Sequence, residues 1–207
     1  MSYFSKIWLP VIAMMYLTGS LSARDLDIDN MNSEIPFDPE VTRGTLDNGL
    51  RYFIKKNTKP ENRLELMLVV QAGAVLEEDN QDGLAHFCEH MAFNGTKNFP
   101  KQKLIDYLES TGVRFGPDLN AFTSWNRTVY MLTLPTDTLE LINNGFQVLE
   151  DWASNISFEP EEIEKERGVI MEEWRLGKGA MDRCEKKRRP VIYYNSSYAE
   201  RDVIGDT

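Results

Sequence analysis

Histidine and cysteine are both scarce in this sequence of 207 residues, which holds two of each. Two cysteines, Cys88 and Cys184, allow at most one disulfide, and this excludes a small secreted scaffold that depends on several bridges. Positive charge is also in the minority, because 23 Lys and Arg stand against 33 Asp and Glu, for a formal net charge of -10. Since that charge repels phosphate groups, we do not expect nucleic acid as a partner.

No apolar run reaches the length of about 20 residues that a membrane-spanning helix needs. The run at residues 7–17 follows one cation, Lys6, and precedes small residues that end at Ala23. This order is typical of a secretory signal peptide. We therefore predict a signal peptide over residues 1–23, with an uncleaved anchor as the alternative, and an exported chain, periplasmic or secreted, without a stable membrane anchor.

The rest of the chain carries strand and helix patterns, which predict an α+β fold with a mixed, mostly antiparallel sheet packed by helices. Residues 24–44 are polar and acidic and read as an extended lead-in. The pair Asn48-Gly49 predicts a hairpin turn into a strand at residues 51–54. The apolar run at residues 64–75 predicts a central strand buried on both faces, and residues 120–134 predict two paired strands.

Four segments show helical spacing between turn or capping residues. They are residues 83–93, 101–110, 138–154 and 159–176. In the third segment Leu139, Ile142, Phe146, Leu149 and Trp152 share one face, which we expect to be buried. The basic cluster at residues 183–189 reads as a solvated turn.

Both histidines lie in one pentapeptide at residues 86–90, His-Phe-Cys-Glu-His. On a helix, residues four apart lie on the same face, so His86 and His90 can bind one metal ion, and two imidazoles are strong zinc ligands. Glu89, beside His90, can take a proton from a metal-bound water. The alternative is an amphipathic helix with two hydrogen-bonded histidines.

A tetrahedral catalytic zinc needs a third protein ligand, which here must be a carboxylate or Cys88. Cys88 lies about 200° around the helix axis from His86 and is better explained as a packed thiol. Glu166 and Glu173 are seven residues apart and share a helix face, so Glu173 can be the ligand and Glu166, behind it, can fix the orientation of the ligand. The residues alone barely separate Glu173 from Glu172.

Three motifs occur in a meaningful order. HFCEHMAFNGT at residues 86–96 is followed by NAFTS at 120–124 and EKERGVIMEE at 164–173. Together they resemble the pitrilysin and insulin-degrading-enzyme family of zinc metallopeptidases, the inverted zincins. The resemblance implies one Zn²⁺ per chain held by His86, His90 and Glu173.

The resemblance also assigns the remaining roles. It implies Glu89 as general base, Glu166 as the second acidic position, and Asn120 and Ala121 as an edge-strand segment that binds an extended peptide. Family members enclose the site between two halves, so we expect residues 45–207 to be an incomplete first domain with more strands to follow. A peptide or small-protein substrate and a missing C-terminal half or homologous subunit are the implied partners.

These features predict an exported zinc metalloendopeptidase domain. The first alternative is a catalytically inactive peptide-binding or partner subunit of the same family. A zinc deaminase is a weaker alternative, because it needs His-x-Glu followed by Pro-Cys-x-x-Cys, and Cys184 has no such neighbour. Of the four Asn-x-Ser/Thr sequons, the one at Asn94 adjoins the histidine helix, where a glycan would obstruct it, so we favour a bacterial periplasm.

Overall fold

The computed structural model describes residues 36–205, which fall into two compact units divided after Asn57. In the first unit, strands β1 (Val41–Thr45) and β2 (Arg51–Lys55) form an antiparallel hairpin. The Leu46 N–H donates to the Leu50 carbonyl at 2.8 Å, and Gly49 adopts a φ of 87°, so the predicted Asn-Gly turn is confirmed. The signal-peptide prediction and most of the lead-in lie outside the described residues.

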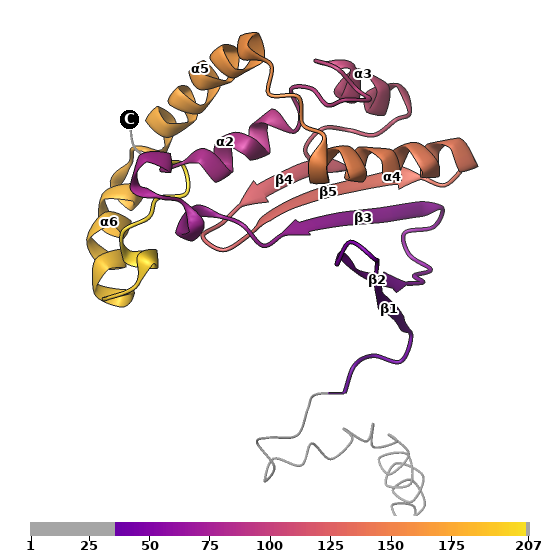
Figure 1. Cartoon of the computed structure of the whole chain (residues 1–207), viewed down its shortest axis with the longest axis horizontal. Coiled ribbons are helices and arrows are strands. Elements are labelled where there is room, and N and C mark those ends of the chain that lie inside the picture. Colours follow the sequence, from indigo (N-terminus) through magenta and orange to yellow (C-terminus); the bar gives the residue numbers. More distant parts are fainter. Residues whose placement is uncertain (1–35, 206–207) are drawn as a thin grey trace, which may run out of the picture. The chain divides into compact units, whose positions relative to one another are not determined.

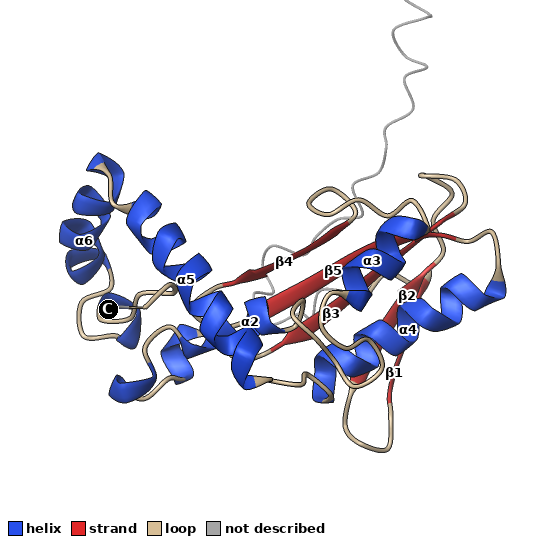
Figure 2. Ribbon diagram, turned by 90° about the horizontal axis from the view of Figure 1, so that it is seen from above, coloured by secondary structure: helices blue, strands red, loops and turns tan. Residues whose placement is uncertain are grey.

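The second unit contains a three-stranded antiparallel sheet, which confirms the predicted α+β class (Figure 1). Its strand order is β3 (Arg63–Val70), β5 (Thr128–Pro135) and β4 (Leu119–Thr123). The prediction that residues 64–75 form a central strand buried on both faces is wrong, because β5 is central and Met67 is 62% exposed. A continuous apolar run fills both faces of a strand, and in the described sheet helices cover only one of them (Figure 2).

The helices of the second unit follow the predicted segments closely. Short 3-10 helices η1 (Ala74–Leu76) and η2 (Asp79–Gln81) precede α2 (Leu84–Met91), α3 (Lys103–Ser110), α4 (Leu139–Ser154) and α5 (Pro160–Gly177). After them come α6 (Ala180–Ile192) and η3 (Ser197–Ala199). No described helix is long and apolar enough to cross a membrane.

Helix α6 replaces the turn that was expected for the basic cluster. Ion pairs one helical turn apart, such as Arg188 with Glu185 and Lys186 with Asp182, run along it. Such pairs stabilise a solvated helix even where no side chain is buried. The prediction of a turn was therefore wrong, because basic residues of this cluster have acidic partners three or four residues away, a spacing that stabilises a helix.

Helix α4 forms the main contact with the sheet, and Val148 and Trp152 are buried there. The predicted face is only partly correct, because Phe146 is 54% exposed and Leu139 is 71% exposed. A Cβ at Gly145 would lie 2.5 Å from Leu134, so the missing side chain lets the helix approach the sheet along the row through residues 145, 148 and 152. Because α4 approaches the sheet along this row, the larger apolar side chains of Leu139 and Phe146 lie outside the buried face of the helix.

Candidate metal centre

Helix α2, which carries both histidines, is anchored at its two ends. At its start the Glu77 carboxylate accepts hydrogen bonds from the Gly83 N–H at 2.9 Å and the Ala85 N–H at 2.7 Å, where the helix dipole favours an anion. At its end the Trp152 Nε1–H of α4 donates to the Ala92 carbonyl at 3.1 Å. The two histidines therefore project from a helix whose position is fixed.

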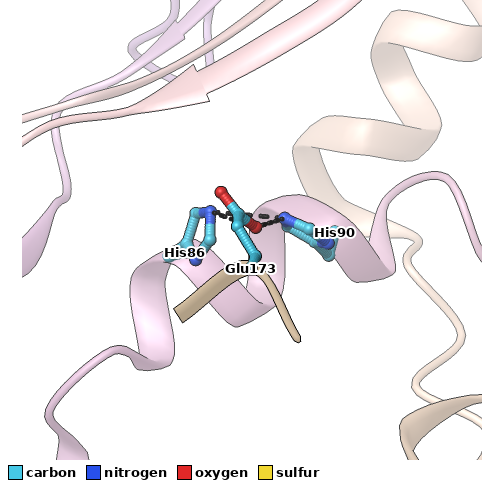
Figure 3. A group of neighbouring side chains, drawn as sticks. All are labelled: His86, His90 and Glu173. Carbon is cyan, nitrogen blue, oxygen red and sulfur yellow. Dashed lines mark hydrogen bonds and ion pairs between the residues drawn. The ribbon is translucent and has the colours of Figure 1, made fainter. Parts of the chain in front are cut away.

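Three donor atoms converge above this helix (Figure 3). The Nε2 atoms of His86 and His90 are 3.2 Å apart, and Glu173 Oε2 lies 3.7 Å from the first and 3.4 Å from the second. The point in their plane that is equidistant from the three atoms lies about 2.0 Å from each, which matches zinc-ligand distances of about 2.0–2.2 Å. Within residues 36–205 this is the one group of three or more His, Cys, Asp or Glu donors close enough to share an ion.

The His90 ring is oriented by Glu166. Its Nδ1 donates to Glu166 Oε1 at 2.7 Å, which leaves the Nε2 lone pair facing His86 and Glu173. Burial opposes the charged form of His90, but the neighbouring Glu166 carboxylate outweighs it and raises the pKa of the imidazole. The same hydrogen bond lowers the pKa of Glu166. From the sequence we expected Glu166 to orient Glu173. In the structure Glu166 is hydrogen-bonded to His90 instead.

The His86 ring is held differently. Its Nδ1 is buried without a hydrogen-bond partner in the described part of the chain, while its Nε2 faces the other two donors. Burial, followed by the charge that His90 can carry, lowers the pKa of His86. A neutral imidazole is the form that binds a metal ion, so His86 meets that requirement.

Glu89 is buried beside the three donors without being one of them. Thr123 Oγ1 donates to Glu89 Oε2 at 2.5 Å. Burial raises the pKa of the Glu89 carboxyl, and the hydrogen bond from Thr123 partly offsets the effect because it favours the ionised form. Glu89 is therefore a carboxylate that is fixed in place and more basic than an exposed one.

Asn120 and Ala121 lie on β4, whose one neighbouring strand in the described sheet is β5; on its other edge Leu119 forms a bridge with Phe115. Ser124 N–H donates to the Arg127 carbonyl where the strands meet, so alternate residues hydrogen-bond across the pair and the Ala121 N–H points to the free edge. The Asn120 Oδ1 accepts that N–H at 2.9 Å. Thr123, two residues later on the same strand face, contacts Glu89, so this edge adjoins the metal centre.

The ligand candidates Glu172 and Cys88, and the second cysteine Cys184, lie apart from the three converging donors. The Glu172 carboxylate pairs with Arg175 on the surface of α5, one turn further along the helix. Cys88 is half-buried, and burial raises the pKa of its thiol. Cys184 is exposed on α6. None of the three belongs to the converging group.

Two polar contacts at this centre were missed in the sequence. Thr123 contacts Glu89, and the Asn94 Nδ2–H donates to Glu166 Oε2 at 2.5 Å. The strand period of two places Thr123 on the face of Ala121, so that contact had a sequence signal. Nothing in the sequence separates Asn94 from an ordinary turn residue, because its partner is 72 positions away.

Known proteins resemble this chain in sequence and in fold over most of its length. A "Probable zinc protease PqqL" of Haemophilus influenzae is 43% identical over 175 residues, which are 84% of this chain and 19% of that protein. The protein of the same name from Escherichia coli is 40% identical over 197 residues, 95% of this chain and 20% of that protein. This chain thus spans about a fifth of the length of these relatives.

A solved structure agrees with the sequence relatives. The crystal structure of the first half of the periplasmic protease PqqL from Escherichia coli superposes with a TM-score of 0.80 at 42% identity, covering 84% of this chain and 37% of that one. The family model of insulinase, peptidase family M16, matches residues 52–204. The chain therefore belongs to the insulinase family of peptidases, family M16.

Proposed function

We propose that this chain carries the zinc site of a peptide-hydrolysing M16 enzyme, with His86, His90 and Glu173 as the ligands and Glu89 as the general base. The single observation that supports this most strongly is the convergence of three donor atoms at zinc-like spacing on two helices. The name "zinc protease" of its relatives points to the same metal. One ion per chain follows from one such group in the described residues.

The chemistry divides between the metal and the chain's own groups. A zinc ion held by His86, His90 and Glu173 would supply a Lewis acid for the peptide carbonyl and would make water a stronger acid near neutral pH. Glu89 accepts the proton of the attacking water and returns it to the leaving amine. Burial raises the pKa of its carboxyl, which makes it a stronger base than an exposed glutamate, and Thr123 holds the carboxylate in place through Oε2.

The edge of β4 supports the binding of an extended peptide. Its outward N–H at Ala121 can pair with a substrate carbonyl, so the peptide adds as a further antiparallel strand. Asn120 Oδ1 covers that N–H in the free chain and moves aside when a peptide binds. The substrate is then a peptide or an extended segment of a small protein, and its register against Glu89 is set through Thr123.

The periplasm is the proposed location. The chain resembles a periplasmic protease over 84% of its length, and residues 1–23 carry the order of a signal peptide. A homologous second half is the proposed partner, because the relatives are several times longer than this chain.

A peptide-binding subunit of the same family that does not cut its ligand is the second candidate. The Glu173 side chain is 50% exposed in the described residues, whereas hydrolytic sites exclude bulk water. This candidate predicts zinc loading and peptide binding without cleavage.

The test uses the chain loaded with zinc and a fluorogenic peptide library. We expect Glu89→Gln to reduce hydrolysis by at least about 100-fold while zinc content stays near one per chain, since the base is lost and the ligands are kept. Glu164→Gln, a surface carboxylate of α5 paired with Arg167, is the matched control and should keep full activity. Unchanged hydrolysis in Glu89→Gln would contradict the base assignment, and peptide binding without any hydrolysis would favour the second candidate.

A further inference from the structure

The Glu166 carboxylate makes two hydrogen bonds, and only one of them goes to a proposed zinc ligand. His90 Nδ1 donates to Oε1 at 2.7 Å, and the Asn94 Nδ2–H donates to Oε2 at 2.5 Å. The Glu166 side chain is 12% exposed, so water competes little for either oxygen. Both oxygens point at the C-terminal end of α2 and the residues that follow it.

Asn94 belongs to a segment that is held firmly. Its N–H donates to the Met91 carbonyl at 3.1 Å, and the next residues are tied to the core through Asp151, which accepts from Thr96 Oγ1 at 2.6 Å. A Cβ at Gly95 would lie 2.8 Å from the Lys101 nitrogen, and Gly95 has a φ of 137°, so the backbone beside Asn94 requires glycine. The amide is therefore presented from a rigid position.

Glu166 lies on a much less constrained element. Helix α5 has no buried residue, and its main neighbour is α2. A carboxylate that accepts a single hydrogen bond can turn about its terminal bond, whereas one with both oxygens engaged cannot. Of the two partners, the fixed Asn94 therefore sets the orientation of the Glu166 carboxylate.

From this geometry, and resting on the proposed zinc site, we propose that Asn94 is a positioning residue of the metal centre. By engaging Oε2 of Glu166 it aligns Oε1 with His90 Nδ1, so the Nε2 of His90 points at the metal position. Among the described residues the Asn94 amide donates to Glu166, not to one of the three proposed ligands. Its effect on metal binding passes through two hydrogen bonds, Asn94 to Glu166 and Glu166 to His90.

Asn98 provides a matched control on the same segment. Its Nδ2–H donates to Asp151 Oδ1 at 2.7 Å, so it is also an asparagine amide on a carboxylate, but that carboxylate lies on α4 and has no link to a histidine. Replacing Asn98 removes a stabilising bond of the fold and leaves the Glu166 contact in place. Asn144, which donates to the Tyr107 hydroxyl at 2.6 Å, offers a second control if the first variant folds poorly.

The experiment is a zinc titration of the full chain by competition with a chelating indicator, together with thermal unfolding of the metal-free chain. We expect Asn94→Ala and the larger, apolar Asn94→Leu to raise the zinc Kd by about 10-fold, the lower end of the range for partners of metal ligands. We expect Asn98→Ala to lower the unfolding temperature while its zinc Kd stays within about twofold of wild type.

Three outcomes separate the possibilities. A zinc Kd within about twofold of wild type in both Asn94 variants overturns the proposal. An equal loss of affinity in Asn98→Ala also overturns it, because the effect would then come from general loosening of the segment. If the wild-type chain binds no zinc, the proposed metal site itself has failed and this inference falls with it, a result distinct from the first two.

Discussion

Helices α4 and α5 have similar lengths and opposite relations to the rest of the fold. Helix α4 has 16 residues and buries four of them, whereas α5 has 18 residues and buries none. Both carry a tryptophan, but Trp152 of α4 is 3% exposed and lies in the core, while Trp174 of α5 lies under the Lys178 ammonium group at the surface.

The two helices therefore serve different purposes: α4 stabilises the fold, and α5 contributes carboxylates to the candidate site. The core depends on α4, which also anchors the end of α2 through Trp152 and the following segment through Asp151. Helix α5 supplies the two carboxylates that meet the histidines, and polar contacts account for much of how it is held. Ligand geometry can therefore change without loss of the fold, and a bound ion should order α5 more than α4.

The largest expected effect comes from truncating the two tryptophans. Trp152→Ala should lower the free energy of unfolding by about 3–5 kcal/mol, because it opens a core cavity and leaves the Ala92 carbonyl without its donor. Trp174→Ala should cost about 1 kcal/mol or less, since it removes a partly exposed ring and one cation-π contact. Denaturant unfolding of the metal-free chain measures both, and equal costs would contradict the division between the helices.

The second effect concerns metal removal. Zinc at a free concentration of 100 times its Kd should add about 2.7 kcal/mol to the stability of the folded chain. In hydrogen exchange, adding zinc should slow the amides of α5 more than those of α4, because the proposed ligand Glu173 lies on a helix without buried residues. Equal protection of both helices, or protection of α4 alone, would show that α5 is already fixed by other contacts.

The third effect concerns pH and the buried Asp151. Burial raises its pKa, but hydrogen bonds from Thr96 and Asn98 outweigh burial and hold the pKa below its ordinary value. A carboxyl with a lowered native pKa adds stability that is present above the unfolded value of about 3.9 and is lost as the pH falls through the native value. Asp151→Asn removes this contribution.

The measurement for Asp151 is denaturant unfolding of the metal-free chain at pH 7 and at pH 3. At pH 7, Asp151→Asn should cost about 1–3 kcal/mol, because the Asn98 N–H and other donors lose a charged acceptor. The difference in free energy of unfolding between wild type and Asp151→Asn should be smaller at pH 3. The exposed Asp106→Asn of α3 serves as control, and a gap that stays constant with pH would contradict the assignment.

Much of the fold was predictable from local pattern. The Asn48-Gly49 turn, the paired strands β4 and β5, and the bounds of α2 to α5 follow from turn chemistry and from periods of 2 and 3.6 residues. The burial of β3 and of α4 was predicted less well, because exposure depends on which face another element covers. Gly145 illustrates this, since a residue without a side chain decided which stripe of α4 packs.

The part of the proposed metal centre that lies on one helix was predictable from the sequence. The spacing of His86, Glu89 and His90 alone predicts that they lie close together on one helix. The choice between Glu172 and Glu173 depends on how α5 crosses α2. The resemblance named Glu173, but nothing in the residue pattern predicts that crossing. The contacts of Thr123 with Glu89 and of Asn94 with Glu166 join residues 34 and 72 positions apart, so only the folded structure shows them.

The most direct test of this account compares zinc binding by two neighbouring carboxylate variants, Glu173→Gln and Glu172→Gln. Zinc titration should give one ion per chain in wild type and in Glu172→Gln, whose carboxylate faces Arg175. In Glu173→Gln the zinc Kd should rise by at least about 100-fold, because one of three ligands is lost. Unchanged affinity in Glu173→Gln, or an equal loss in Glu172→Gln, would contradict a metal centre built from His86, His90 and Glu173.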